Sequence, residues 1–491
     1  MNPLKKLASQ TAIYGIPGIA GRFLNYLLTY LYTRVFSLDQ FGVNSEFYAY
    51  SGFFIVLLAF GMETGYFRFS KDAENPKSVY TTTLNFIIGT STIFLLLIYV
   101  FGQHIADVLK YPDHVEYIYW FGWILALDAI CSIPFAKLRA ENKAFQFAGI
   151  KVVEIGVNIA FNIFFLIICR SAYQNHAGNW LAELYNPAIG VGYVFIANLI
   201  ASGVKMVLLL PQIKEGFKDF DKELLGKIVR YSLPMVVIGF AGIINEMLDR
   251  MILKYTLPYD DITNLQMLGI YGACYKLSIL MSLFIQAFRF AAEPFFFAQS
   301  TKDNSRKIYA DVMHYFTLFC VFIFLLVMLY MDWFQYFIGA PFRVGLGVVP
   351  ILLMANLFLG IYVNLSIWYK LTDRTMLGAA VSIGGAVLTI ILNILLIPSM
   401  GYFGSAWATL ACYVGMAGVS YILGQKYYPV PYNTAKLFTY IAVGLGLWQL
   451  FEWLHASIMP SVPFWAISSA IMLVFFATVW AIDGRKLLKR G

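Results

Sequence analysis

Five basic residues of this 491-residue chain lie inside long apolar segments, where an ionised side chain is costly. They are Arg22, Lys151, Lys205, Lys276 and Arg289. A charge at the centre of a bilayer costs about 2.5–3.5 kcal/mol on insertion scales, so such residues face a protein interior or a wet cavity. In a cavity, the chemistry of these residues is the binding of an anion.

The surroundings of two of these residues favour a cavity. Arg22 and Lys276 each lie near the middle of an apolar segment, with no carboxylate three or four residues away. We therefore expect both to contact a bound anion, and we include Arg289 as a third candidate for substrate binding. The alternative for Arg22 and Lys276 is an ion pair with another helix, for example through Asp128.

The remaining basic residues have local explanations. Lys151 is followed one turn later by Glu154, which predicts an ion pair within one helix. Arg289 has Glu293 at i+4, so a local pair is the alternative to anion binding there. Lys205 lies near the end of its segment, from which a lysine can snorkel to the interface.

Two carboxylates in apolar segments are candidates for coupling a proton or cation. Asp128 lies at mid-depth in its segment, and Glu63 lies between two glycines in the stretch 61–65. Glu246 and Asp249 lie together in a later segment. A buried hydrogen bond between helices is the alternative for each of these four residues.

The composition requires a membrane for this chain. Of its residues, 60% are hydrophobic, 18% are aromatic and only 13% are charged, about half the usual charged share. The five cysteines lie in apolar runs and form no disulfide framework. The net charge of +8 is not gathered into a cluster of the kind that binds nucleic acid.

Fourteen segments are long and apolar enough to span a bilayer. Their approximate limits are 9–35, 42–69, 80–102, 115–138, 144–170, 187–212, 226–253, 264–297, 307–331, 343–369, 376–398, 403–425, 433–456 and 462–483. With the N-terminus in the cytoplasm, 24 of the 35 Lys and Arg residues fall on the cytoplasmic side. Six fall on the opposite side: Arg34, Lys110, Arg170, Arg250, Lys254 and Arg343. We read the first segment as a retained helix rather than a signal peptide.

The two halves of the chain share an ordered set of short matches. Residues 14–17 (Tyr-Gly-Ile-Pro) match 231–234 (Tyr-Ser-Leu-Pro), and Lys137-Leu138 matches Lys370-Leu371. A unit of six helices leaves both copies in the same orientation. We therefore predict an all-α polytopic membrane protein with two pseudo-symmetric six-helix bundles and two extra C-terminal helices. The predicted divisions are 1–212, a cytoplasmic linker 213–228, 229–426, and 427–491 with a basic cytoplasmic tail.

Pro17 and Pro234 occupy matching positions of the two halves. Proline in a spanning helix frees backbone carbonyls and bends the helix, and matched breaks point to a central binding site. Two purely structural kinks are the alternative reading of this pair.

The sequence carries no signature of an enzyme. It contains no phosphate-binding P-loop and no His-Glu-x-x-His, and its five histidines are scattered. We expect no catalytic residues, no cofactor and no metal.

The fourteen-helix plan, the basic N-terminus before a Gly/Pro-containing first helix and the stretch Gly61-Met62-Glu63-Thr64-Gly65 resemble the polysaccharide-biosynthesis flippases. These form the oligosaccharidyl-lipid branch of the multidrug/oligosaccharidyl-lipid/polysaccharide exporter superfamily. The resemblance implies two bundles in the bacterial inner membrane, both termini cytoplasmic, with a cationic lumen to which Arg22 and Lys276 contribute.

The resemblance also implies a function and partners. The substrate would be an undecaprenyl-pyrophosphate-linked oligosaccharide for O-antigen, capsule or exopolysaccharide, moved by alternating access. Partners would be membrane lipids, a polysaccharide polymerase and chain-length machinery, and no nucleic acid. The absence of a basic residue in mid-span of the second segment argues against the related lipid II flippases.

Two other functions stay open at this point. A cation-coupled multidrug or metabolite antiporter would have carboxylates in its lumen, whereas the first segment here has Arg22 and no carboxylate. A non-transporting scaffold would have its intramembrane charges mutually paired.

We predict that Arg22→Glu abolishes surface glycan, because the substituted carboxylate repels a pyrophosphate. The measurement is surface glycan together with the amount of protein in the membrane. Intact glycan at a normal protein level would refute this role.

Overall fold

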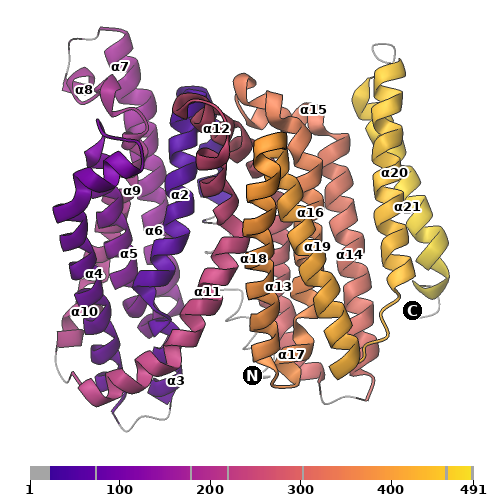
Figure 1. The fold of residues 1–491 in the computed structure, drawn as a ribbon, viewed down its shortest axis with the longest axis horizontal. Helices are drawn as coiled ribbons and strands as arrows, with labels where there is room; N and C mark the ends of the chain where they lie inside the picture. Colours follow the sequence, from indigo (N-terminus) through magenta and orange to yellow (C-terminus); the bar gives the residue numbers. More distant parts are fainter. Residues whose placement is uncertain are drawn as a thin grey trace. The chain divides into compact units, whose positions relative to one another are not determined.

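The computed structural model describes residues 21, 23–71, 75–176, 178, 180–217, 220–300, 303–458 and 463–487. These residues form helices and turns, with no strand among them (Figure 1). Twelve helical spans in this part are long and apolar enough to cross a membrane. A thirteenth results if Trp180–Ile189 and Gly192–Leu208, which meet at 116°, form one span. The predicted all-α polytopic class is confirmed, whereas the count of fourteen stays a prediction because about half of the predicted span 9–35 lies outside the described residues.

The chain divides into two compact units. Unit 1 comprises the described residues up to Gly272 together with Asn393–Gly401, and unit 2 comprises the remainder. Unit 1 holds a helix over 23–35, α2 (Leu38–Ala59), α3 (Met62–Lys71), α4 (Pro76–Val108), α5 (Val115–Ala140), α6 (Ala144–Ile163), a π-helical turn Phe164–Cys169, α7 (Arg170–Gln174), α8 (Trp180–Glu183), α9 (Gly192–Leu208), α10 (Leu210–Lys214), α11 (Lys222–Thr256) and most of α12 (Asp261–Leu277). Unit 2 holds α13 (Ile279–Gln299), α14 (Ser305–Leu329), α15 (Met331–Phe334), a 3-10 segment Ala340–Val348, α16 (Val349–Leu365), α17 (Ile367–Leu371), most of α18 (Thr375–Met400), α19 (Tyr402–Tyr427), α20 (Thr434–Ile458) and α21 (Phe464–Leu487).

These units follow packing, whereas the predicted divisions follow the sequence repeat. The boundary between the units lies at Gly272, and α11 packs against α2 and α3 within unit 1. The repeat instead places the boundary at the linker 213–228. Shared ancestry and close packing are different properties, so the division into 1–212, 213–228, 229–426 and 427–491 stays a prediction.

The predicted continuous span 264–297 is wrong, because α12 and α13 are separate helices with Ser278 between them. The buried Ser278 hydroxyl donates to the carbonyl of Tyr275 at 2.7 Å, and its backbone N–H donates to the same carbonyl at 3.1 Å. This tight turn replaces the regular i to i−4 pattern at that point.

The stretch 61–65 forms the junction of α2 and α3. Phe60 and Gly61 have φ of 47° and 66°, a conformation that favours glycine and ends α2. A Cβ on Gly65 would lie 2.7 Å from a methyl carbon of Ile228 on α11. The two glycines therefore provide a turn and a close approach between helices.

The long helix α11 begins at an N-cap and continues through a proline. Asp221 Oδ1 accepts hydrogen bonds from the N–H groups of Glu223 and Leu224, at 2.9 and 3.0 Å. The helix is uninterrupted across Pro234, while Pro17 lies outside the described residues. The matched helix break at Pro17 and Pro234 stays a prediction.

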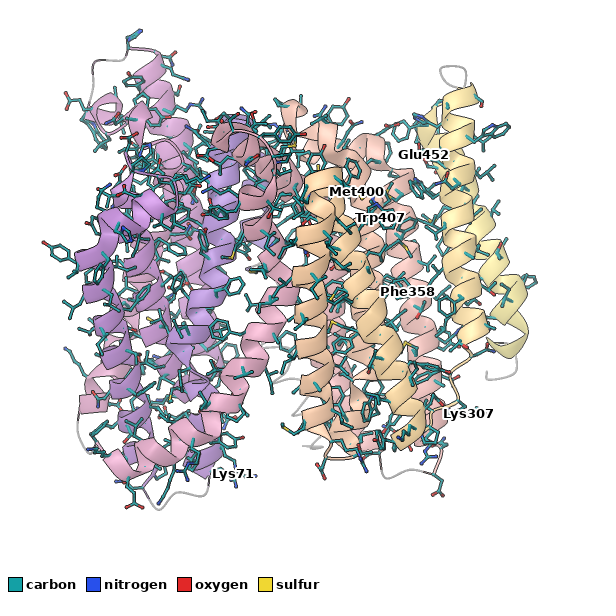
Figure 2. The ribbon with its side chains drawn as sticks, viewed as in Figure 1. Lys71, Lys307, Phe358, Met400, Trp407 and Glu452 are labelled. Carbon is teal, nitrogen blue, oxygen red and sulfur yellow. The ribbon has the colours of Figure 1, made fainter. Side chains whose placement is uncertain are left out.

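Unit 2 is organised around α14 and α16, which have the largest buried shares of its spans. Figure 2 shows Lys307 at one end of this unit, Phe358 midway and Glu452 toward the other end. Lys307 belongs to the start of α14, Phe358 to the middle of α16 and Glu452 to the later part of α20.

Polar contacts join α20 and α21 to α14 at one end, and join α20 to α15 at the other end. Asp483 of α21 forms an ion pair with Lys436, accepts a hydrogen bond from Tyr440 at 2.5 Å and has His314 Nε2 of α14 at 2.8 Å. At the other end of α20, His455 lies 3.0 Å from Asp332 of α15.

We predict that Asp483→Asn destabilises the protein by about 3–5 kcal/mol, the usual cost of removing one partner of a buried ion pair. The Asp483 side chain is only 7% exposed, so Lys436 would be left without its counter-charge. Thermal unfolding in detergent measures the effect. The control is Glu452→Gln, which changes an exposed carboxylate of α20. Equal unfolding midpoints for both variants would contradict the prediction.

Candidate functional site

A pocket in unit 2 brings two basic residues together. Arg289 of α13 and Lys370 of α17 line a small hollow that is partly open to the outside of the unit. The other lining residues are Phe288, Ala292, Phe296, Val363, Ser366 and Ile367. The described lining residues include these two basic groups, which together suit a phosphate group.

Aromatic packing fixes the walls of this pocket. The ring of Phe288 lies 4.4 Å from that of Phe316 on α14, measured between centroids. The hydroxyl of Tyr309 donates to the carbonyl of Phe296 at 2.9 Å. These contacts hold α13 against α14, so the position of Arg289 is set by a packed surface rather than by a loop.

The structure describes the predicted substrate-binding residues unequally. Arg289 lies in the pocket, and Lys276 is half-buried in the last turn of α12 and does not line it. Arg22 lies outside the described residues, and so does the side chain of Glu293. The local pair between Arg289 and Glu293 therefore stays a prediction.

Unit 1 contains a cluster of charges inside its spans. Lys205 Nζ of α9 donates to Asp128 Oδ1 of α5 and to Glu154 Oε1 of α6, both at 2.6 Å. The hydroxyl of Ser202 donates to the same Asp128 oxygen at 2.6 Å. Lys151 Nζ lies 2.9 Å from Glu154 Oε2, which confirms the predicted pair within α6.

The burial of this cluster is uneven. The Lys205 side chain is 3% exposed, so it does not snorkel to the interface, because two carboxylates solvate it inside the unit. The side chain of Asp128 is 36% exposed, so it is less enclosed by protein than its lysine partner. In the described part of the chain, no three His, Cys, Asp or Glu side chains are placed to hold a metal ion.

The other predicted carboxylates form interhelical contacts or face outward. Glu63 Oε1 lies 2.5 Å from the guanidinium of Arg139, which joins α3 to α5. Asp249 is buried and accepts a hydrogen bond from Tyr271 at 2.6 Å, whereas Glu246 is exposed. A coupling role for Glu63 stays a prediction.

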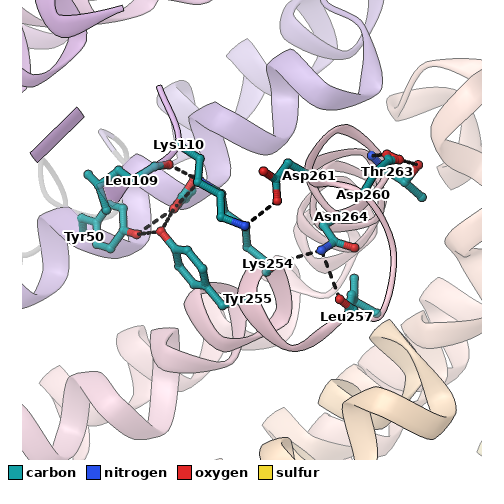
Figure 3. A network of polar contacts seen from close by, with 11 residues as sticks. Tyr50, Leu109, Lys110, Lys254, Tyr255, Leu257, Asp260, Asp261, Thr263 and Asn264 are labelled. Atoms are coloured by element: carbon teal, nitrogen blue, oxygen red, sulfur yellow. Dashed lines mark hydrogen bonds and ion pairs between the residues drawn. The ribbon is translucent and has the colours of Figure 1, made fainter. Parts of the chain in front are cut away.

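A fully buried ion pair between Glu46 of α2 and Lys254 of α11 was not predicted. Lys254 Nζ donates to Glu46 Oε1 and Oε2 at 3.0 and 2.8 Å and to the carbonyl of Leu109 at 2.7 Å (Figure 3). Tyr50 donates to Glu46 Oε1 at 2.7 Å, and Tyr111 donates to Oε2. The apolar run that predicts this span ends at 253, which places Lys254 in an outer loop, but α11 continues to Thr256.

Polar contacts surround this ion pair at the start of α12 (Figure 3). Lys110 lies 2.5 Å from Asp261, at the exposed rim. Asp260 accepts hydrogen bonds from the hydroxyl and the N–H of Thr263, at 2.6 and 3.0 Å. These bonds hold the pKa of the Asp260 carboxyl below its usual value and cap the helix.

The sequence matches no family model and no curated protein, but the structure resembles solved ones. Lipid II flippase MurJ in an inward closed conformation gives a TM-score of 0.72 at 14% identity, covering 97% of this chain and 99% of that chain. MATE in the straight conformation gives 0.60 at 12% identity, covering 87% and 96%. An outward-facing multidrug resistance MATE family transporter of the MOP superfamily gives 0.51 at 14% identity, covering 85% and 94%.

These likenesses establish a class of fold. The chain has the multi-pass helical fold of these solved structures, one of which is described as a MATE family transporter of the MOP superfamily. The neighbours are named as a flippase and as transporters, and none is named as an enzyme. At 12–14% identity the likeness extends to the fold and not to a substrate.

We predict that Lys205→Met lowers the stability of unit 1, because it leaves two carboxylates with only Lys151 as a counter-charge. Removing one partner of a buried pair costs about 3–5 kcal/mol, and the partial exposure of Asp128 reduces that value. Thermal unfolding in detergent is the measurement, with Lys151→Met as the control at the exposed edge of the cluster. Adding Asp128→Asn should recover part of the loss, and additive losses would contradict the ion-pair explanation.

Proposed function

We propose that this chain is a flippase that moves an undecaprenyl-pyrophosphate-linked oligosaccharide across the bacterial inner membrane by alternating access. The observation that carries the proposal is the pocket in which Arg289 and Lys370 line the same space. The fold that this chain has in common with a lipid flippase supports the same proposal.

The physical task explains why cations are needed. A pyrophosphate with a polar glycan must cross about 30 Å of hydrocarbon, while the prenyl tail can remain in lipid. Guanidinium and ammonium groups replace the water around the phosphates through charge-assisted hydrogen bonds. In the proposal, Arg22 and Lys276 bind the headgroup along with Arg289. An inside-negative potential assists outward movement by about 2.3 kcal/mol per elementary charge per 100 mV.

The further parts of the proposal concern coupling, orientation and partners. Asp128 is the coupling carboxylate that the geometry favours, because it is partly exposed while its ammonium partner is buried. Glu63, already paired with Arg139, is the second candidate. Both termini face the cytoplasm, and a polysaccharide polymerase with its chain-length machinery uses the delivered glycan. The product is O-antigen, capsule or exopolysaccharide.

A cation-coupled multidrug or metabolite antiporter is the second candidate function. It is favoured by the partly exposed carboxylate in unit 1 and by the fold that the chain has in common with MATE transporters. The two functions differ in what the unit 2 pocket binds. A site lined by arginine and lysine repels cationic drugs, so it does not suit an antiporter for them.

We predict that Arg289→Glu and Lys370→Glu each reduce surface glycan about tenfold or more, because a charge-assisted hydrogen bond contributes about 1.5–3 kcal/mol. The variants are expressed in a host deleted for the native gene. Surface glycan is quantified together with the lipid-linked oligosaccharide that accumulates inside.

The matched control is Lys307→Glu, which makes the same charge change at an exposed position of α14 (Figure 2). It should leave surface glycan at the wild-type level. Normal glycan in both pocket variants, with altered drug tolerance in the deletion strain, would favour the antiporter instead.

A further inference from the structure

At one end of unit 1, the backbone of α2 touches the backbone of α12. A Cβ on Gly42 would lie 2.1 Å from the carbonyl oxygen of Leu265, and one on Gly269 would lie 2.0 Å from that of Leu38. Only glycine allows two helices to approach this closely. We call this region the outer contact, because the predicted topology places it on the periplasmic side. It comprises residues 38–50 of α2, Lys254 and Tyr255 of α11, and residues 261–272 of α12.

The ion pair of Glu46 and Lys254 lies inside the outer contact. The two side chains are 0% and 1% exposed, and the ammonium group has three hydrogen-bond acceptors. A buried ion pair contributes little net stability compared with an apolar contact of the same size, because both charges lose their hydration. Separating the two side chains into water restores their hydration. The ion pair therefore determines which groups meet in the closed contact, while opening the contact costs little free energy.

The opposite end of α11 has a different chemistry. Ile228 is fully buried in the apolar cluster that includes Leu58, Met62 and Tyr66. Opening that end would expose apolar surface to water, with no hydration to recover. Apolar packing therefore holds the beginning of α11. A contact made of polar side chains and glycines holds its end.

We propose that the outer contact is a gate: α2 separates from the ends of α11 and α12 to open a path toward the predicted periplasmic side, and the Glu46–Lys254 pair must break for this to happen. This inference rests on the alternating access of the proposed function. Lys110 and Asp261 at the exposed rim separate with it.

Labelling of a single cysteine tests the gate without any substrate. All five native cysteines are buried and free, so they are replaced first, and Ser45→Cys then reports on the outer contact. A membrane-impermeant maleimide is applied from outside the cell. We expect Lys254→Met to raise the labelling rate of this cysteine about tenfold or more, because it leaves Glu46 buried without its counter-charge.

Two glycine variants give a matched comparison. Gly42→Leu blocks closure by steric overlap and should raise labelling as Lys254→Met does. Gly89→Leu in α4, which has open space around its Cβ, should leave labelling unchanged. Tyr259→Cys, placed at an exposed loop residue, should label in every variant and so confirms a folded protein and the side of the membrane.

A reversible cross-link tests the closed state. An added Cβ on Gly272 would lie 3.0 Å from Ser45 Cβ, close to the disulfide separation of about 3.5–4.5 Å. We expect oxidised Ser45→Cys/Gly272→Cys to lose surface glycan and to recover it on reduction, whereas each single variant keeps it.

In a strain whose surface glycan is lost when the gene is removed, intact glycan with the cross-link formed would overturn the gate. Unchanged labelling in both Lys254→Met and Gly42→Leu would overturn it as well. Failure of the proposed function looks different: labelling would respond as expected, but removal of the whole gene would leave surface glycan unchanged.

Discussion

The structure depends on one constraint: a charge inside an apolar layer needs a counter-charge or water. In the described part of the chain, Lys205 is neutralised by Asp128 and Glu154, Lys254 by Glu46, and Asp483 by Lys436. Each set joins different helices, and the helices that Lys205 and Lys254 join are not consecutive in the chain. Because apolar helix faces gain little from each other in lipid, polar pairs and close glycine contacts decide which helices become neighbours. The charges are thus part of the architecture as well as candidates for chemistry.

Patterns within one helix could be predicted, and contacts between helices could not. The spacing of Lys151 and Glu154 identified their pair, because three residues along a helix bring side chains to one face. Lys205 finds its partners 51 and 77 residues away, and no spacing encodes such a distance. Lys254 was assigned to an outer loop because the apolar run ends there, although the helix continues and its partner lies 208 residues away.

The candidate site shows the same division. Arg289 was a candidate because it is a basic residue within an apolar segment. Lys370 was counted among the cytoplasmic residues, so their common pocket was not predicted. The break at Ser278 was also missed, since one serine in an apolar run is compatible with a continuous helix. The role of Gly42 became visible only with the backbone of α12 against it. Glycine identity gives no indication of which helix approaches.

The charge cluster of α5, α6 and α9 has an electrical consequence. Two ammonium groups and two carboxylates sum to zero, so a rearrangement that carries all four together displaces no gating charge across the bilayer field. The voltage dependence of such a protein would then arise from its cargo and from charges outside this cluster, because the movement of the cluster itself transfers no net charge.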